Sequence, residues 1–420
     1  MDRVIVIGGG ISGLLSACAL SREGKRVLLF EKGHLGNVVR SYSVEGDSGE
    51  YIVDTGPHII TRLTSGPLRQ LMDAYVDTNP VFIPHGTYYL RINDGYYQFP
   101  WALKDIARFE PLTRKDRFLL LRCIMDGILL RDKSISVAEF IAQYDLTSSA
   151  GKLVDALCYF LAGVPMDRVP IQRFWDSQQV KDGVTDNTVK KIFNLFNQGS
   201  RHDQFYPRGG IQTITDSLVK SFKGEIIQQE VISIDPDRKH VFTSETDYPY
   251  DLIVYSGMMK TLSSLVNLPA EYRNMTDNLE TSRSLTLWIG TRDEVVTRRG
   301  SEIWVDTDPP CWMVPTSLYD QSLAPEGCQL LGCAFPFIHP QKAVDAVMQV
   351  FPDLDIDMLH YQILQPDKAA WTTAPFPPIT TPIPHIYAVG TDTVKKSMGI
   401  TRASYSVLAL LETLRGEKRL

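Results

Sequence analysis

The chain has 420 residues, of which 44% are hydrophobic, and a formal net charge of -6 at pH 7. This length and composition allow two or more domains with a sizeable core. Acidic and basic residues are interspersed, so the sequence lacks the basic field that attracts nucleic acid, and no segment approaches the ~18 apolar residues that span a bilayer.

The cysteines are scattered along the chain, with no CxxC pair and no histidine at ligand spacing. They are Cys18, Cys123, Cys158, Cys311, Cys328 and Cys333. This pattern predicts neither a metal site nor a disulfide framework, and it is typical of reduced thiols in a cytoplasmic protein. The apolar run at the N-terminus leads into glycines rather than a small-residue cleavage site, which argues against a signal peptide.

The N-terminal thirty residues have the pattern of a βαβ unit. A β-branched run at residues 3–7 (RVIVI) is followed by glycines at residues 8–13 (GGGISG), by an Ala- and Leu-rich helix to about Arg22, and by a second apolar run at residues 26–30. A buried strand that opens through glycines into a helix is the usual context of a dinucleotide-binding fingerprint. A βαβ turn without a ligand is the alternative.

Each glycine of this fingerprint has a separate physical role. Gly8 permits the tight turn, Gly10 lets the backbone approach a diphosphate, and Gly13 lets the helix pack closely on the strand. The free N–H groups of the helix N-terminus then attract the anion. Glu31, eighteen residues after Gly13, ends the second strand, where its carboxylate can accept both hydroxyls of an adenosine ribose.

Two later stretches of the sequence favour FAD over NAD as the cofactor. Residues 53–58 (VDTGPH) close a hairpin predicted to begin at Tyr42, and residues 386–414 repeat the order of the N-terminus, with a strand, a glycine turn and a helix. Here the sequence resembles the FAD-dependent family that includes phytoene desaturases, protoporphyrinogen oxidases and flavin amine oxidases. In that family the DTGP-like segment borders the flavin, the Gly-Asp turn holds the ribityl chain, and the last helix faces the pyrimidine edge. Because FAD is too long for one loop, the resemblance assigns one end of it to each glycine turn.

The resemblance extends to two further segments. Residues 206–211 (YPRGGI) look like the family's YPxGG turn before a helix, and residues 224–256 resemble a hairpin that would place Val231 against the adenine. The resemblance implies noncovalent FAD, since the C-terminal segment offers no cysteine for a thioether. The cofactor-binding residues that it implies are Gly8, Gly10, Ile11, Ser12, Gly13, Glu31, Lys32, Arg40, Thr55, Gly56, Pro57, His58, Val231, Gly390, Asp392, Gly399 and Ile400.

The sequence departs from the family pattern in two places. The Gly-Gly-Arg that commonly follows the ribose acid is replaced by residues 36–40 (GNVVR), which leaves Arg40 as the candidate diphosphate arginine. Residues 394–399 (VKKSMG) replace the HPGGG-like segment of phytoene desaturases, which argues against carotene desaturation.

The predicted fold class is α/β, with a Rossmann-type FAD-binding domain built on a parallel sheet and an α+β substrate domain of antiparallel sheet and helices. The FAD-binding domain is assigned to residues 1–75, 205–275 and 370–420, and the substrate domain to residues 76–204 and 276–369. In the substrate domain the patterns predict helices at residues 102–108, 114–130, 136–143 and 150–161, a hairpin about Asn93-Asp94-Gly95, and strands at residues 284–289 and 329–335. The apolar residues 118–130 form either an amphipathic core helix or a surface that touches a membrane or lines a lipophilic tunnel.

Three side chains are candidates for a catalytic role. His58 follows the flavin-bordering segment, and a histidine side chain can transfer protons near neutral pH; a structural or flavin-contacting role is the alternative. Lys395, together with Lys396, lies beside the ring-binding loop, where a cation stabilises anionic reduced flavin, although a solvated pair has the same pattern. Tyr405 on the last helix is the candidate for an amine-binding cage.

The resemblance implies an FAD-dependent oxidoreductase that exchanges a hydride between flavin N5 and a C–C or C–N bond of a largely apolar small molecule. Nucleic acid is not an expected partner, and a peripheral membrane contact is left open. Three alternatives remain: a flavin amine oxidase, a non-enzymatic lipid or prenyl carrier of the same fold, and a flavin-dependent sugar-nucleotide mutase. The last would bind a diphosphate through Arg173, Arg201, Arg208 and Tyr206.

Overall fold

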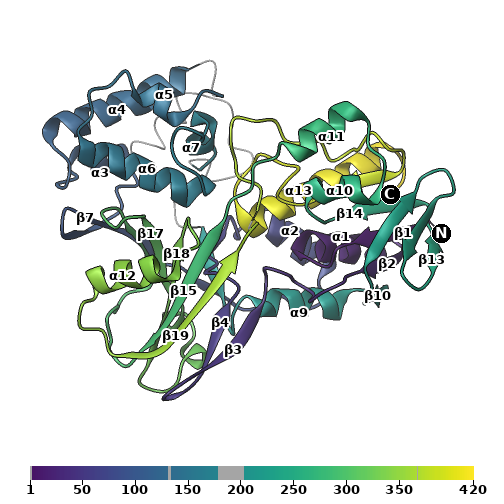
Figure 1. The fold of residues 1–420 in the computed structure, drawn as a ribbon, viewed down its shortest axis with the longest axis horizontal. Helices are drawn as coiled ribbons and strands as arrows, with labels where there is room; N and C mark the ends of the chain where they lie inside the picture. Colours follow the sequence, from purple (N-terminus) through teal and green to yellow (C-terminus); the bar gives the residue numbers. More distant parts are fainter. Residues whose placement is uncertain (1, 131–133, 178–202, 367) are drawn as a thin grey trace.

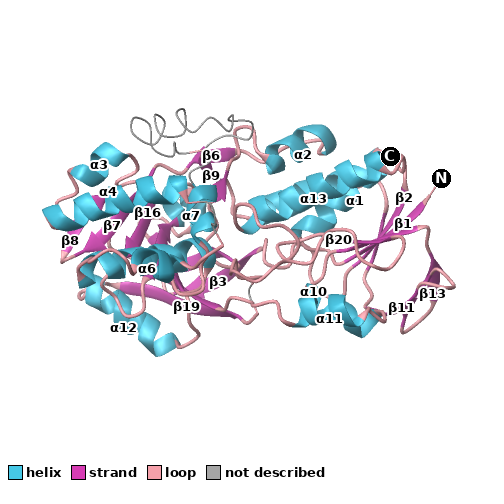
Figure 2. Cartoon of the chain, turned by 90° about the horizontal axis from the view of Figure 1, so that it is seen from above, coloured by secondary structure: helices cyan, strands magenta, loops and turns pink. Residues whose placement is uncertain are grey.

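A computed structural model describes residues 2–130, 134–177, 203–366 and 368–420 of the chain. Figure 1 shows a parallel sheet around β1 at one end of the molecule, where both termini lie, and a larger sheet with helices α3–α7 and α12 at the other end. Figure 2 shows the same separation from above, with α3, α4, α6 and α7 opposite β1, β2 and β20. The molecule is elongated along this direction.

The parallel sheet has the strand order β10-β2-β1-β14-β20, and every neighbouring pair is parallel. Its strands are β1 (Arg3–Ile7), β2 (Arg26–Phe30), β10 (Glu225–Ile227), β14 (Leu252–Tyr255) and β20 (Ile386–Ala388). Both faces are covered, which explains why these strands are continuous apolar runs. Alternate residues of β1 enter different cores: Val4 and Val6 on one face, Ile5 and Ile7 on the other.

Helices cover the first face of this sheet, and a small antiparallel sheet with two helices covers the second. The helices of the first face are α1 (Ile11–Arg22), α2 (Pro67–Tyr75), α9 (Gln212–Ser221) and α13 (Gly399–Gly416). The elements of the second face are β11 (Val231–Asp235), β12 (His240–Thr243), β13 (Asp247–Pro249), α10 (Met259–Leu265) and α11 (Ala270–Asp277). Helices α1 and α13, from the two ends of the chain, pack against each other.

The larger sheet has the order β19-β15-β18-β17-β16-β7-β8 and is antiparallel except for the β16–β7 pair. Its strands are β7 (Thr87–Ile92), β8 (Gly95–Gln98), β15 (Ser284–Thr291), β16 (Gly300–Trp304), β17 (Cys311–Pro315), β18 (Gln329–Phe335) and β19 (Ile356–Leu364). The helices associated with it are α3 (Leu103–Ala107), α4 (Arg114–Leu129), α5 (Val137–Ile141), α6 (Ser148–Ala162), α7 (Ile171–Ser177) and α12 (Pro340–Val350).

Short elements join the two halves of the molecule. They are the hairpin of β3 (Ser41–Gly46) and β4 (Gly49–Asp54), the sheet of β5 (Ile60–Thr61), β9 (Gln204–Pro207) and β6 (Phe82–Pro84), and the 3-10 turns η1 (Thr316–Leu318) and η2 (Gln321–Leu323). Tyr51 on β4 packs into the core of the larger sheet, together with Tyr206 and Trp288. The hairpin is therefore anchored to the larger sheet.

The predicted fold class is confirmed: a Rossmann-like parallel sheet is combined with a mixed, largely antiparallel sheet and helices. The predicted hairpin turn has positive φ at Asn93 (51°) and Asp94 (57°), as a two-residue turn of type I′ requires. The domain boundaries stay a prediction. In the described part of the chain, no helix is long and apolar enough to cross a membrane.

Candidate dinucleotide and substrate site

The turn between β1 and α1 shows which glycines the protein itself needs. Gly8 has a φ of +102°, and a Cβ on Gly13 would lie 1.9 Å from the carbonyl oxygen of Gly8. A Cβ on Gly10 would approach no protein atom more closely than the Cβ of Asn37, at 4.0 Å. Packing therefore requires Gly13, whereas the space at Gly10 faces a cavity and suits the close approach of a ligand.

Glu31 lies beside this turn, at the end of β2. Its carboxylate accepts hydrogen bonds from the backbone N–H of Gly9 (2.6 Å) and of Gly33 (2.6 Å). The acidic group is thus held at the edge of the glycine turn, as a ribose-binding carboxylate must be. The neighbouring Lys32 points elsewhere, because it forms an ion pair with Glu230 and is 69% exposed.

A cavity of about 340 Å³ lies at the carboxyl ends of the parallel strands. The chain runs from β1 to β2 on one side, whereas it runs from the neighbouring strand β14 to β20 on the opposite side, and parallel α/β sheets bind ligands in the crevice at such a point. The predicted residues that line the cavity are Gly10, Ile11, Ser12, Thr55, Gly56, Pro57, His58, Gly390, Asp392, Gly399 and Ile400. Four separate stretches of sequence thus meet at one cavity.

Two helix N-termini open onto this cavity. The N-cap residues, Gly10 of α1 and Met398 of α13, both line it, and neither provides a side-chain cap to the helix that follows. Uncapped N-termini present N–H groups and the positive end of the helix dipole to an anion. The cavity therefore suits a long ligand with negative charge at two places, as FAD has in its diphosphate and in the pyrimidine end of its ring.

Asp392 and His58 are polar groups in the cavity wall. Asp392 is 6% exposed and accepts hydrogen bonds from the Met259 N–H (2.9 Å) and the Thr391 hydroxyl (3.0 Å). Burial is the main influence on this carboxyl group, and it raises the pKa of Asp392. The half-buried His58 places Nδ1 2.6 Å from the carbonyl oxygen of Gly56. Both side chains are fixed in orientation at the cavity.

The remaining predicted residues do not line the cavity. Gly8 and Gly13 shape the turn behind it, Arg40 accepts the Thr55 N–H through its main-chain carbonyl, and Val231 is buried on the second face of the sheet. Two of the three catalytic candidates also lie outside: Lys395 donates to the Thr372 carbonyl (2.9 Å), and the Tyr405 hydroxyl accepts from Arg62 (3.0 Å). Of these candidates, the structure brings only His58 to the cavity.

The YPxGG-like segment holds the cavity wall in place. Asp54, at the end of β4, is 1% exposed and accepts hydrogen bonds from the Tyr206 hydroxyl (2.7 Å), the Ile211 N–H (3.0 Å) and the Ser41 hydroxyl (2.6 Å). The segment thus turns into α9, as predicted, and fixes the exit of β4 where the wall begins.

Cys311 on β17 lines the cavity, although the sequence drew attention only to the C-terminal segment for a thiol. It is 3% exposed, and burial, with a further contribution from Cys333, raises the pKa of the Cys311 thiol well above its usual value. A thiol held protonated is a poor nucleophile, so this cysteine is unsuited to covalent attachment. In the described part of the chain, no group of histidine, cysteine and acidic residues is arranged to hold a metal ion.

A second, largely apolar cavity of about 280 Å³ adjoins the first. Its walls come mainly from α3–α7 and β7, and it shares Phe160, Leu161, Ile303 and Met398 with the first cavity. On α4, Leu120, Cys123 and Ile124 line it, while Phe118 is 65% exposed. The helix predicted as either core or tunnel wall therefore forms part of an apolar cavity.

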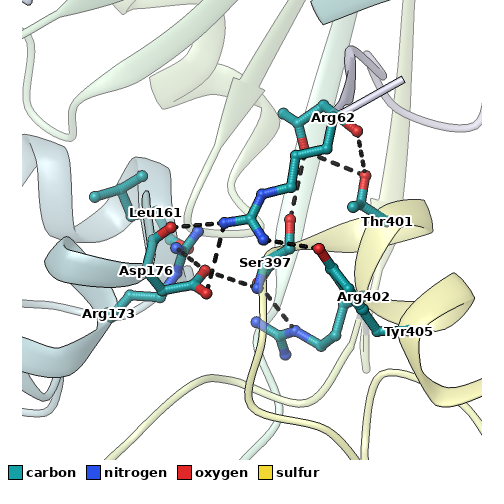
Figure 3. A network of polar contacts seen from close by, with 9 residues as sticks. Arg62, Leu161, Arg173, Asp176, Ser397, Thr401, Arg402 and Tyr405 are labelled. Atoms are coloured by element: carbon teal, nitrogen blue, oxygen red, sulfur yellow. Dashed lines mark hydrogen bonds and ion pairs between the residues drawn. The ribbon is translucent and has the colours of Figure 1, made fainter. Parts of the chain in front are cut away.

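A buried polar network joins α7 to the N-terminal part of α13 (Figure 3), and Arg62, Arg173, Asp176 and Ser397 of this network line the second cavity. Asp176 of α7 accepts the Ser397 N–H (2.7 Å), pairs with Arg173 (3.3 Å) and lies 3.6 Å from Arg62. Arg402 of α13 donates from Nε to the Ser397 carbonyl (3.3 Å). The sequence analysis missed Arg62, Asp176 and Arg402. A charged residue inside the small and apolar run of residues 399–411 was the available signal for Arg402.

The residues proposed for a sugar-nucleotide site do not converge on one cavity. Arg173 lines the second cavity but pairs with Asp176, Tyr206 binds Asp54, and Arg208 is exposed. Tyr206 and Arg208 line neither cavity. Arg201 lies outside the described residues. The geometry therefore gives no support to diphosphate binding by this set.

Comparisons with known sequences identify a Rossmann-like domain near the N-terminus. Residues 6–75 match the model of the NAD(P)-binding Rossmann-like domain. An uncharacterised protein in the nifH2 3′ region of Methanothermococcus thermolithotrophicus is 46% identical over 103 residues, which cover 24% of this chain and 96% of that protein. Human all-trans-retinol 13,14-reductase is 25% identical over 240 residues, which cover 50% of this chain and 38% of the human protein. The match thus spans less than half of that reductase.

Solved structures share the whole fold. A crystal structure of an oxidoreductase from Methanosarcina mazei aligns with a TM-score of 0.80 and 19% identity, covering 98% of this chain and 100% of that one. A putative protoporphyrinogen oxidase from Exiguobacterium aligns with a TM-score of 0.71 and 14% identity, covering 99% of each chain. At these identities the likeness concerns the fold. The chain belongs to one family with the Methanothermococcus protein, and it shares its fold with the Methanosarcina oxidoreductase and the putative protoporphyrinogen oxidase.

Proposed function

We propose that the protein is an FAD-dependent oxidoreductase that exchanges a hydride with a C–C or C–N bond of a largely apolar small molecule. The observation that carries this proposal is the pair of uncapped helix N-termini, of α1 and α13, on one cavity that adjoins a second, apolar cavity. A lipid carrier has no physical need for both N-termini. The human relative is all-trans-retinol 13,14-reductase, and because retinol is largely apolar, this similarity supports an apolar substrate.

The chain's own residues would bind and orient the cofactor. The N–H groups at the start of α1 would hold the diphosphate, Glu31 the ribose, and Asp392 the ribityl chain, with His58 and Cys311 in the wall. Bound flavin supplies the hydride chemistry. Phe160 and Ile303, which line both cavities, would exclude water where substrate and cofactor meet.

The first experiment is the absorption spectrum of the purified protein, followed by heat release and identification of the chromophore. Flavin bands that leave with the supernatant as FAD would support the proposal and allow substrates to be screened by loss of flavin absorbance under anaerobic conditions. A colourless protein that also fails to take up added FAD would contradict it, and lipid carriage in the apolar cavity would then be the better explanation.

Replacing Glu31 with alanine is expected to weaken FAD binding about tenfold or more, since a hydrogen bond to a charged group contributes about 1.5–3 kcal/mol. FAD affinity is measured by titration of the apoprotein, with the quenching of flavin fluorescence as the signal. Lys32→Ala is the matched control, because Lys32 is exposed and forms a surface ion pair with Glu230. Equal affinities in the two variants would show that Glu31 does not hold the ribose.

Leu157→Trp is expected to block the apolar cavity, which Leu157 lines, without reaching the first cavity. The FAD content should match that of the wild type, whereas the rate of flavin reduction by a substrate found in the screen should fall about tenfold or more, because added volume excludes the substrate. Leu157→Met, of similar volume, serves as the control. Unchanged reduction by Leu157→Trp would place the substrate elsewhere.

A further inference from the structure

Arg402 is a buried cation that has no role among the cofactor contacts proposed above. It lies in the first turn of α13, is 1% exposed and lines the first cavity. Helical side chains lean toward the N-terminus, so its guanidinium group reaches the backbone that precedes the helix. Besides the Ser397 carbonyl, it donates from Nη1 to the carbonyl oxygens of Ala369 (2.9 Å) and Thr391 (3.4 Å).

The charge of Arg402 is not neutralised by an ion pair within the described part of the chain. The carboxylates of Asp392 and Asp176 act on Arg402 electrostatically, but each has other partners. Asp392 accepts the Met259 N–H and the Thr391 hydroxyl. Asp176 accepts the Ser397 N–H and pairs with Arg173. Burial, reinforced by Arg173, lowers the pKa of Arg402 to about 9. Carbonyl dipoles and the faces of the Trp371 and Phe376 rings, whose centroids lie 5.5 Å and 5.9 Å from Cζ, compensate this buried charge in part, and an anionic group in the cavity would compensate it further.

The surroundings of Arg402 reinforce this positive potential. The uncapped N-terminus of α13 lines the same cavity through Met398, Gly399 and Ile400. Lys395, in contrast, donates to the Thr372 carbonyl outside the cavity, and the Lys396 Nζ lies 4.0 Å from the centroid of the Tyr405 ring. Among the basic residues that line the cavity, Arg283 is exposed and Lys368 is half-buried, so Arg402 is the buried cation at its wall; neither of the two lysines that the sequence suggested lines it.

We propose that Arg402 stabilises negative charge on the pyrimidine end of the bound flavin. This inference rests on the proposed function. If a substrate C–H bond broke and its hydride, with both electrons, passed to flavin N5 while a proton from the adjacent carbon or nitrogen passed to water, the substrate would be oxidised and the flavin reduced, and the added negative charge would spread to the N1–C2=O group. A fixed guanidinium beside that group makes the transfer more favourable without any reorganisation.

Sulfite titration tests this role without a substrate. The sulfur lone pair of sulfite forms a bond to flavin N5, and the resulting negative charge appears at N1–C2=O, so the dissociation constant of sulfite reports the local stabilisation of that charge. We expect the wild type to form the adduct and Arg402→Gln to bind sulfite about tenfold more weakly or worse. The two-electron potential should fall in parallel, by about 30 mV for each tenfold change. Arg402→Lys, which keeps the charge, should remain close to the wild type.

Lys396→Gln is the matched control, since it removes a cation outside the cavity and should change sulfite affinity by no more than about twofold. Equal sulfite affinities and potentials in FAD-loaded wild type and Arg402→Gln would overturn the inference, and so would a wild type that holds FAD but forms no adduct. If Arg402→Gln fails to fold, Arg402→Met, which also removes the charge but keeps a long unbranched side chain, takes its place in the same comparison. A wild type that takes up no FAD would instead refute the proposed function, and this inference with it.

Discussion

Gly13→Ala is expected to unfold the glycine turn, with a loss of stability of about 3 kcal/mol or more. The new Cβ would lie 1.9 Å from the Gly8 carbonyl oxygen and 3.1 Å from the Gly8 carbonyl carbon. Both atoms belong to the main chain, so no change of rotamer relieves the clash and α1 must move away from β1. The expected results are a lower midpoint of urea unfolding and a loss of FAD uptake.

Gly10→Ala provides the comparison that separates packing from ligand binding. Gly10 has a φ of -68°, which alanine adopts without strain, and the added Cβ would meet no protein atom closer than 4.0 Å. Stability should therefore match that of the wild type, while FAD affinity falls about tenfold because the methyl group occupies the approach of the diphosphate. If Gly13→Ala were as stable as the wild type, or Gly10→Ala bound FAD equally well, the assigned roles of these glycines would be wrong.

Asp176→Ala is expected to destabilise the protein by about 3–5 kcal/mol, because removal of one partner leaves buried charge uncompensated. Asp176 is 8% exposed and binds Arg173, Arg62 and the Ser397 N–H. Ser397 directly precedes the N-cap of α13, so release of this contact should also loosen the N-terminus that faces the cavity (Figure 3). Urea unfolding measures the first effect, and FAD affinity the second.

Asp73→Ala is the control for Asp176→Ala. Asp73 pairs with Arg69 one helical turn away, and their side chains are 49% and 43% exposed, so its loss should change stability by about 0.5 kcal/mol or less. Equal destabilisation by the two substitutions would show that the Asp176 network does not join α7 to the cofactor loop. A stability loss in Asp176→Ala without a change in FAD affinity would limit its role to folding.

The sequence by itself determined the element types and the fold class. Strands at residues 3–7, 26–30 and 329–335 appear as predicted, because a short apolar run bounded by turn residues depends on local periodicity alone. The glycine turn could be predicted for the same reason, because the steric need for Gly8 and Gly13 arises within ten residues of chain. The second unit of strand, glycine turn and helix, at residues 386–416, was predictable because it has the same local pattern as the first.

Only the tertiary structure decided which side chains face the cavities. Lys395 and Arg402 are seven residues apart beside the same loop, and the sequence does not show where either side chain points. In the packed structure Lys395 contacts the Thr372 carbonyl, whereas Arg402 lines the cavity. Cys311 enters the wall from β17, and Asp176 reaches Ser397 across 221 positions of sequence. Local pattern specifies where helices and strands begin, but contacts between distant segments specify the site, because burial and hydrogen-bond satisfaction are settled only when those segments pack together.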